Sequence, residues 1–568
     1  MDRGRAFIEL RDRLLRDGIS REEAMRCFHW PPVPHFNWAR DYFDRIAVGN
    51  DRPALQVVDD AGLDETLSFD ALAGRSNQVA DFLSGLGVGP GDRLLIMLGN
   101  VVALWETMLA AIKLDAVMIP ATTLLQRGDL EDRLTRGAVR AVIAEHTRAE
   151  AFEGLAGASI RISVGGAVPG WHAFEESRGA DPRWRSERAT PADSLMLLYF
   201  TSGTTARPKL VAHTHVSYPV GHLTTAYWLG LRRGDIHLNL SSPGWAKHAW
   251  SCFFAPWNAQ ARVLAYQYQR FSAKALLDQL VRRRVTTFCA PPTVWRMLIQ
   301  EDLRRWPVVL REVIGAGEPL NPEIIEQVRA AWGLTIREGF GQTETTAQIG
   351  YPPGEPSKPG SMGRPLPGYR VALVGADGSC GDEGEICIDL ERRPIGLMQG
   401  YLDDPGKTAE VMRGGYYHTG DVATRDADGY FTYVGRLDDV FKSSDYRISP
   451  FELESVLIEH PAVVEAAVVP SPDPLRLSVP KAFVVLAAGA VADAATARSI
   501  LDYVRSRVAP FKRIRRIEFA ELPKTISGKI RRVELRRAEL ARPAGTARRR
   551  LEYWEEDWGT GSEGSRTP

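Results

Sequence analysis

The chain has 568 residues, enough for several domains or for one large domain and a small one. Hydrophobic residues make up 44% of it and charged residues 25%, an ordinary globular balance that excludes wholesale disorder. Acidic and basic residues cancel at 71 each, which argues against a general binder of nucleic acid or of anionic membranes.

Short apolar runs alternate with amphipathic stretches over most of the chain. The run 92–98 predicts a strand, 103–114 a helix and 116–121 the next strand. Further strands are expected at residues 139–145, 194–200 and 285–290. This alternation of strand and helix predicts an α/β fold with largely parallel sheets.

The pattern changes in the last two hundred or so residues. A turn-rich stretch, 351–368, precedes a segment rich in β signals, 369–433. Ser449-Pro-Phe-Glu452 then forms a capping box with proline at the first helical position, and this helix should stop before Pro461. A strand near 481–489 and a helix near 495–508 follow. We predict a large N-terminal domain over 1–437, a small α+β domain over 438–541 and a disordered tail over 542–568.

The cysteines and the apolar regions indicate in which cellular compartment the protein is expected. No two of the cysteines have C-x-x-C spacing, which disfavours a disulfide framework or a zinc site and favours a reducing compartment. The longest apolar region, near 101–125, is interrupted by Glu106, Lys113 and Asp115, too often for a membrane span. The charged N-terminus lacks a signal-peptide core. We expect a cytoplasmic protein without an integral membrane segment.

A loop rich in small and hydroxylated residues directly follows the strand at 194–200. It reads Thr201-Ser-Gly-Thr-Thr-Ala-Arg-Pro-Lys209, which suits wrapping polyphosphate with backbone N–H groups and hydroxyls. It is not a Walker loop, because Leu210 follows the lysine. A polar turn without a ligand is the alternative that spacing alone leaves open. The expected phosphate-binding residues are Thr201, Ser202, Gly203, Thr204, Thr205 and Lys209.

Five more motifs follow this loop along the chain. They are Gly315-Ala-Gly-Glu-Pro-Leu320, Gly339-Phe-Gly-Gln-Thr-Glu344, Tyr417-His-Thr-Gly-Asp421, Gly435-Arg-Leu-Asp-Asp439 and Pro523-Lys-Thr-Ile-Ser-Gly-Lys529. In content and order, the six motifs resemble those of the adenylate-forming superfamily that includes acyl-CoA synthetases. The phosphate loop departs from it at Ala206, where glycine is usual. The segments 244–250 and 471–476 look most like those of medium-chain acyl-CoA synthetases.

The resemblance implies an ATP-dependent acid–CoA ligase. The carboxylate would attack the α-phosphate of ATP to give an acyl adenylate, and CoA would then displace AMP. Lys529, Thr343 and Glu344 would be catalytic, and Glu344 would hold Mg²⁺. Besides the phosphate loop, the expected ATP and AMP contacts are Gly317, Glu318, Pro319, Gly339, Phe340, Gly341, Gln342, Asp421 and Arg436.

The resemblance also gives expectations for the acyl group, for CoA and for domain motion. Trp245 and Gly341 would line the acyl pocket, and Gly341 replaces the tryptophan of acetate-specific relatives. Medium-chain and aromatic acids both remain open, whereas the segment 244–250 has no carboxylate to pair an α-ammonium group. The hinge would be Asp438, so the small domain is expected to be mobile. The expected CoA contacts are Ser444, Asp445, Tyr446, Arg447, Arg476, Lys512 and Arg513, with Asp445 where related ligases usually have glycine.

Two other functions stay open at this point. The first is an adenylating enzyme that passes its acyl group to a carrier protein, although we expect no carrier-like segment after Leu540. The second is a nucleic-acid binder that uses the strongly basic stretch 505–550. Few aromatic residues interrupt that stretch, so it is a weak candidate for stacking on bases.

Overall fold

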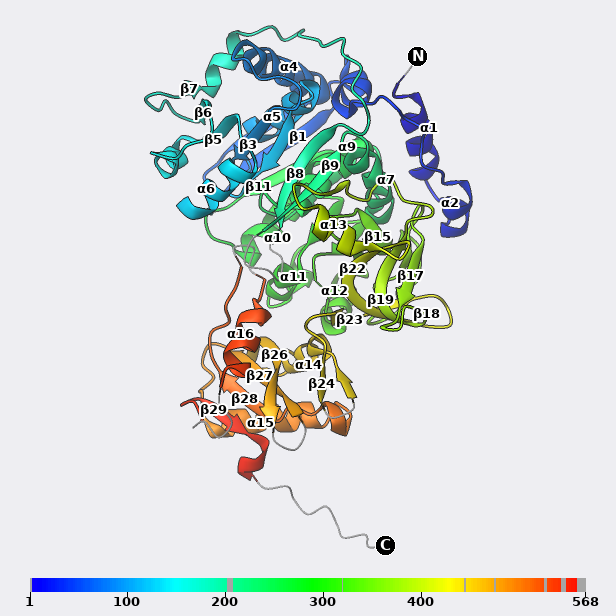
Figure 1. The fold of residues 1–568 in the computed structure, drawn as a ribbon, viewed down its shortest axis with the longest axis vertical. Helices are drawn as coiled ribbons and strands as arrows, with labels where there is room; N and C mark the ends of the chain where they lie inside the picture. Colours follow the sequence, from blue (N-terminus) through cyan, green and yellow to red (C-terminus); the bar gives the residue numbers. More distant parts are fainter. Residues whose placement is uncertain are drawn as a thin grey trace, which may run out of the picture. The chain divides into compact units, whose positions relative to one another are not determined.

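A computed structural model of the protein describes residues 3–201, 208–318, 320–443, 446–473, 477–525, 529–542 and 548–558 (Figure 1). By its internal contacts the chain divides into two compact units. The larger unit comprises Met1–Ala372, Cys387–His418 and Asp426–Phe431. The smaller unit comprises Leu373–Ile386, Thr419–Arg425 and Thr432–Pro568, so it takes in two segments that precede the boundary expected at residue 437.

The described part of the larger unit contains an eight-stranded sheet in the order β20-β9-β8-β4-β3-β5-β6-β7. The strands from β3 to β8 pair in parallel, and β9 is antiparallel to both β8 and β20. The bounds are β3 Arg93–Met97, β4 Val117–Pro120, β5 Ala141–Glu145, β6 Ile160–Val164, β7 His172–Ala173, β8 Leu195–Thr201, β9 Lys209–Thr214 and β20 Gly400–Tyr401.

Helices cover both faces of this sheet, as a parallel sheet requires. Leu94 and Ile96 belong to a core shared with α4 (Phe69–Gly85) and α5 (Val102–Lys113). Leu95 and Met97, which alternate with them, belong to a core shared with α6 (Arg127–Arg136). Both faces of the strand are therefore apolar, which is why β3 reads as a continuous apolar run.

A second sheet of the larger unit has six strands within the described residues, in the order β13-β12-β10-β11-β1-β2. It is parallel except for β2. Apolar residues of α10 (Ala273–Arg282), α11 (Pro292–Leu298) and α12 (Pro322–Trp332) pack on it. The bounds are β1 Pro53–Asp59, β2 Asp64–Ser68, β10 Ile236–Asn239, β11 Arg262–Gln267, β12 Thr287–Ala290 and β13 Glu312–Gly315.

Helix α5 explains the interrupted apolar region near 101–125. Every residue of this helix is buried, including Glu106 and Lys113. The Lys113 ammonium group lies 2.7 Å from an Asp44 carboxylate oxygen and donates to Asn77 at 2.7 Å, so its charge is paired inside the protein. Among the described residues, the longest and most apolar helices still fall short of what crossing a membrane needs.

The β-rich segment forms two sheets, of which the first is antiparallel. β14 (Gly339–Gly341), β15 (Ala347–Gly350) and β16 (Arg364–Pro365) make the first. The second has the order β18-β17-β19-β22-β21, with β23 beside β22, and the division between the two units passes through β19 and β22. Its bounds are β17 Val371–Val374, β18 Cys380–Gly381, β19 Glu383–Asp389, β21 Met412–Arg413, β22 Tyr416–Arg425 and β23 Phe431–Arg436.

The larger unit contains seven further α-helices within its described residues. They are α1 Arg5–Leu14, α2 Arg21–Cys27, α3 Asp44–Ala47, α7 Ser217–Leu229, α8 Ala246–Ala249, α9 Ala255–Asn258 and α13 Pro405–Val411.

The smaller unit packs helices on a sheet with the order β26-β27-β28-β29, beside the hairpin β24-β25. Ser449 accepts the N–H of Glu452 at 3.1 Å and Pro450 opens α14, which confirms the expected N-cap and helix start. The Glu452 carboxylate, expected to complete a capping box, instead accepts a hydrogen bond from Lys512 at 2.7 Å. The α/β fold with a β-rich part and a small α+β unit is likewise confirmed. The bounds are β24 Phe441–Ser443, β25 Tyr446–Ile448, α14 Pro450–Leu457, β26 Val463–Asp473, β27 Leu477–Leu486, α15 Ala494–Arg505, β28 Arg516–Phe519, α16 Arg532–Leu540 and β29 Glu552–Trp554.

The expectation of a disordered tail over 542–568 is wrong for residues 552–558. Glu552–Trp554 form β29, antiparallel to β28, and a 3₁₀ turn follows at Glu555–Trp558. The buried Lys481 ammonium group pairs with carboxylates of Glu518, Glu539 and Glu552 at 2.8, 3.0 and 2.9 Å. The buried charge of Lys481 thus holds the segment 552–558 against the rest of the smaller unit through Glu552, a contact that amino-acid composition cannot predict.

Candidate active site

The two ends of the expected phosphate loop are register partners in the sheet. Thr201 ends β8 and Lys209 begins β9, and the two pair in the antiparallel ladder. Ser202, Gly203, Thr204 and Thr205 lie outside the described residues. The Lys209 ammonium group lies 5.0 Å from the centre of the Tyr401 ring on β20, the strand next to β9. A cation is therefore fixed at the base of this loop.

The segment 339–344 runs from strand β14 into a tight turn. A side chain at Gly339 would lie 2.5 Å from Trp228, and one at Gly341 would lie 2.6 Å from the Thr346 carbonyl oxygen. Close backbone packing thus requires glycine at both positions, in addition to any role beside an acyl group. The Gln342 N–H donates to Thr345 Oγ1 at 3.0 Å, which closes the turn.

Thr343 and Glu344, expected to be catalytic, are half-buried residues of this turn. His213 of β9 contacts the Thr343 carbonyl oxygen through Nε2 at 2.7 Å. The Tyr401 hydroxyl donates to Glu344 Oε1 at 3.0 Å. Sequence reasoning predicted neither His213 nor Tyr401 as a supporting residue, because neither belongs to one of the six motifs.

His213 holds the Thr343 carbonyl as a neutral imidazole. Its Nε2–H must be the donor to a carbonyl, so Nδ1 accepts the Ser217 hydroxyl at 3.1 Å. Burial lowers the pKa of His213 to about 4, although the bond to Thr343 opposes this shift. The turn is therefore positioned without a formal charge near neutral pH.

The expected adenine-contacting turn follows β13. Gly317 and Glu318 are exposed, and Pro319 lies outside the described residues. Lys247 donates to the Ala316 carbonyl oxygen at 2.7 Å, and the Leu320 N–H donates to Glu338 Oε1 at 2.7 Å. Burial raises the pKa of Glu338 to about 7, against the opposing effect of that hydrogen bond.

Two tryptophans stand near the expected acyl pocket. Trp245 precedes α8 and Trp250 follows it, and both are half-buried. The Trp250 ring centre lies 5.9 Å from that of Trp228, the residue that packs against Gly339. Trp228 therefore lies between Gly339 of the adenylate segment and the ring of Trp250.

Two further tyrosines hold motif residues. Within the larger unit, the Tyr417 hydroxyl donates to Gln342 Oε1 at 2.9 Å, which joins the ribose motif to the adenylate motif. Within the smaller unit, Tyr433 and Arg436 bond the two carboxylate oxygens of Asp421, each at 3.0 Å. Burial, and then the Asp421 charge, hold the pKa of Tyr433 well above its usual value. Sequence reasoning missed Tyr433, which no motif marks.

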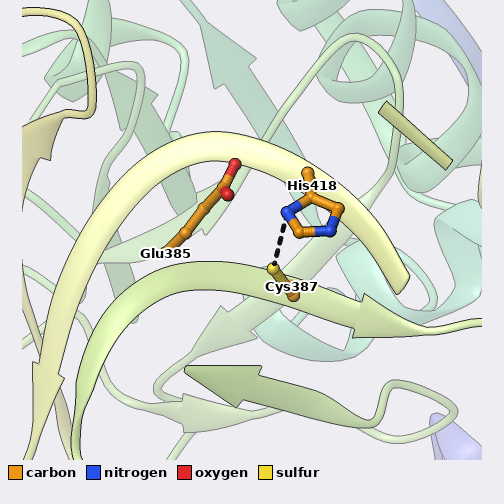
Figure 2. Close-up of side chains that lie close together, drawn as sticks. All are labelled: Glu385, Cys387 and His418. Carbon is orange, nitrogen blue, oxygen red and sulfur yellow. Dashed lines mark hydrogen bonds between the residues drawn. The ribbon is translucent and has the colours of Figure 1, made fainter. Parts of the chain in front are cut away.

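His418 of the ribose motif is bonded within the sheet. Figure 2 shows it with Glu385 and Cys387, and its Nδ1 lies 3.4 Å from Cys387 Sγ. Within the parts of the chain that the structure describes, these three residues are the only group whose ligand atoms gather closely enough to hold a metal. Glu385 already accepts the Gly420 N–H at 2.7 Å. We assign this group a structural role.

The expected hinge and C-terminal lysine belong to the smaller unit. Asp438 lies 3.8 Å from Arg436, and its carbonyl oxygen accepts a hydrogen bond from Arg536 of α16. Lys529 is exposed, and its N–H donates to Thr525 Oγ1 at 3.1 Å. The Thr525 N–H in turn donates to the Lys529 carbonyl oxygen at 2.8 Å, so two hydrogen bonds join these residues.

Few of the expected CoA contacts can be located. Ser444, Asp445 and Arg476 lie outside the described residues, as do the side chains of Tyr446 and Arg447. Lys512 pairs with Glu452 at 2.7 Å. Arg513 is half-buried, and its Nε has no hydrogen-bond partner among the residues described. The CoA assignments stay predictions.

Two family models match the chain. The first, AMP-binding enzyme, covers residues 40–402. The second, AMP-binding enzyme C-terminal domain, covers residues 452–529. Together they cover the phosphate loop, the motifs at 315–320 and 339–344 and the C-terminal lysine motif, whereas the ribose and hinge motifs lie between the two matched ranges.

Relatives match over nearly the whole chain. "4-hydroxybutyrate--CoA ligase 1" of Metallosphaera sedula is 42% identical over 94% of this chain and 96% of its own length. "Acyl-coenzyme A synthetase ACSM3, mitochondrial" of Rattus norvegicus is 40% identical over 92% of this chain and 94% of its own. A crystal structure of the anthranilate CoA ligase AuaEII in complex with anthranoyl-AMP is 28% identical, covers 89% of this chain and 98% of that one, and has a TM-score of 0.81. The chain belongs to the AMP-binding enzyme family, and it is an AMP-forming acid–CoA ligase that acts on a carboxylic acid, ATP and CoA.

Proposed function

We propose that the protein joins a medium-chain or aromatic carboxylic acid to CoA through an acyl adenylate. One observation carries this proposal: Tyr401 joins Glu344 of the adenylate segment to Lys209 of the phosphate loop. A carboxylate and a cation that belong to different motifs thereby contact one tyrosine, the carboxylate at its hydroxyl and the cation over its ring. Such fixed charges suit a reaction in which charge grows on phosphoryl oxygens.

In the first step, side chains of the protein would bind and orient two anions, ATP and the carboxylate of the acid. Lys209 would contact the β- and γ-phosphates of ATP, and Thr343 would donate to the α-phosphate. Lys529 would bring a cation to the carboxylate and to the α-phosphate oxygens. Asp421 would accept the ribose hydroxyls, which requires Tyr433 and Arg436 to share its two oxygens with the nucleotide. Pyrophosphate leaves, and the acid becomes activated with AMP as its leaving group.

Glu344 fits the role of a Mg²⁺ ligand. One carboxylate oxygen takes the bond from Tyr401, and the other has no hydrogen-bond partner within the described part of the chain. Carboxylate oxygens are the ligands that Mg²⁺ prefers beside substrate phosphates. The ion would neutralise phosphate charge during adenylation.

The acid is proposed to be larger than acetate and to have a tail without an ammonium group. Position 341 carries no side chain, and the aromatic rings of Trp245 and Trp250 suit apolar groups, each buried methylene adding about 0.8 kcal/mol. Relatives named for 4-hydroxybutyrate and anthranilate are consistent with a small or medium acid. The cytoplasm is the proposed location, since all five cysteines are free.

The test is an incubation with ATP, Mg²⁺ and a panel of acids, first without and then with CoA. Pyrophosphate release reports adenylation, and thioester formation reports the second step. We expect both, with medium-chain or aromatic acids ahead of acetate and amino acids in kcat/KM. Adenylation that never yields acyl-CoA would favour transfer to a carrier protein instead. Acetate as the best substrate would refute the proposed acid class.

A further inference from the structure

His222 is a buried histidine of α7 with one unsatisfied ring nitrogen. The residue is 1% exposed, and its Nδ1 lies 2.9 Å from Thr225 Oγ1. Its Nε2 is buried and has no hydrogen-bond partner among the described residues. Buried polar atoms are nearly always paired, with protein, water or ligand, because leaving one unpaired costs free energy.

The hydrogen bonds of Thr225 decide which nitrogen of His222 carries the proton. Thr225 Oγ1 accepts the Ala347 N–H at 3.3 Å. Within the described structure, the hydroxyl proton of Thr225 then has one acceptor, the Nδ1 of His222. Nδ1 is therefore the acceptor and Nε2 the donor. Burial, and then the nearby His213, hold the pKa of His222 well below its usual value, so this donor is neutral.

Through Thr225, the same contacts connect His222 with the strand that pairs with the adenylate segment. Ala347, which bonds Thr225, is the register partner of Gly341. The imidazole is stacked with two aromatic rings. Its centre lies 6.5 Å from that of the half-buried Trp250, with 28° between the ring planes, and 6.3 Å from that of Phe254, with 17° between the planes. The ring of Tyr218 meets it edge-on at 4.3 Å. One neutral donor thus stands among aromatic rings, and one of these rings, Trp250, belongs to the proposed acyl site.

We propose that His222 Nε2–H donates a hydrogen bond to the tail of the acid, so that the preferred substrates carry a hydroxyl, carbonyl or ether oxygen there. Ligand sites are typically apolar with a few placed polar groups that fix orientation. An alkyl tail of equal size would leave the donor unpaired, and sites of this kind reject such analogues strongly. The inference rests on the proposed function and narrows its substrate class.

The test compares acids in matched pairs by kcat/KM for pyrophosphate release. Each pair has a hydroxyl or methoxy group in one member and a methyl or ethyl group in the other, on aliphatic and benzoic acids. We expect the wild-type protein to favour the oxygen-bearing member of at least one pair by tenfold or more. A methoxy acid preferred over its ethyl counterpart would identify the protein group as the donor. Ratios within twofold for every pair would overturn the inference and leave Nε2 to water, while pyrophosphate release itself reports the proposed function separately.

Two variants trace the preference to this nitrogen. His222→Phe keeps an aromatic ring without the donor, and we expect the ratio to fall to within twofold. Thr225→Val keeps the shape of that side chain but removes the hydroxyl that fixes the proton of His222 on Nε2. The preference for the oxygen-bearing acid should then decrease without disappearing, which tests the inference even if His222→Phe does not fold. His237 is the control, because both of its nitrogens are bonded, to Thr287 and Ser251. His237→Phe should lower the melting temperature and leave the ratio unchanged; a folded His222→Phe variant with the wild-type ratio would refute the assignment.

Discussion

The Tyr401 hydroxyl donates to Glu344 Oε1 at 3.0 Å, and the Lys209 ammonium group lies 5.0 Å from the centre of the same ring. Tyr401 therefore orients a carboxylate and restrains a cation with one side chain. The pairing of β20 with β9 fixes this arrangement, since it places Tyr401 opposite Val211. Tyr401 is thus a positioning residue for the two groups that would manage phosphate charge.

Tyr401→Phe keeps the ring beside Lys209 and removes the bond to Glu344. A hydrogen bond to a charged group contributes roughly 1.5 to 3 kcal/mol. We expect adenylation to slow by about tenfold or more, and the Mg²⁺ concentration for half-maximal rate to rise. Pyrophosphate exchange at graded Mg²⁺ measures both.

Tyr430→Phe is the matched control for Tyr401→Phe. Tyr430 has the same kind of neighbours, Lys358 at 5.6 Å over its ring and Glu355 at 3.4 Å from its hydroxyl, but no expected site residue. This variant should keep the wild-type Mg²⁺ response. An unchanged Mg²⁺ response in Tyr401→Phe would show that Glu344 needs no such support.

Lys529→Ala should abolish adenylation and retain the conversion of supplied acyl adenylate to acyl-CoA. The reason is that, in the proposed mechanism, the ammonium group would serve only the attack on the α-phosphate. Separate assays of the two half-reactions measure this. Lys524→Ala is the control, because Lys524 is also exposed in the same segment and pairs with Glu465 at 2.6 Å. Equal loss of both half-reactions in Lys529→Ala would contradict the assignment.

Glu338 should make the protein less stable as pH rises. Its pKa is about 7 in the folded state against 4.5 for an ordinary glutamate, so the folded state holds the proton that the unfolded state releases. The free energy of unfolding should therefore fall between about pH 4.5 and 7, by at most about 1.4 kcal/mol per pH unit. Glu338→Gln should flatten this dependence in thermal melts across that range. The same slope in both proteins would exclude Glu338 as its source.

Glu552→Gln should loosen the C-terminal strand. Burial alone would raise the pKa of Glu552, but the bonds from Arg542 and Lys481 outweigh it and lower the pKa to about 2. Losing one charge of this buried group should cost roughly 3 kcal/mol. Hydrogen exchange of β28 and β29 and the melting temperature measure the effect. Glu556→Gln, at an exposed position, should change neither. The wild-type contribution should likewise be lost as pH falls from about 4.5 toward 2.

Local signals of the sequence determined the elements and the motifs. Apolar runs with turn residues at their ends predicted β3, β8 and β12 within a few residues, because a strand covered on both faces needs apolar residues throughout. The cap of α14 was predictable because both partners lie within four residues. The order of the six motifs likewise indicated the family, since it depends on sequence alone.

Only the tertiary structure decided which side chains support those motifs. Tyr401 and Glu344 are 57 residues apart, Tyr417 and Gln342 are 75, and Lys481 and Glu552 are 71. No local pattern relates residues at such separations, because their contact depends on how strands pair and not on the propensity of either segment. The same holds for the neutral His213 and His222, whose protonation follows from burial and from partners on other elements. The chemistry of this chain is encoded in short motifs, but only the tertiary structure brings Tyr401 to Glu344 and Lys481 to Glu552.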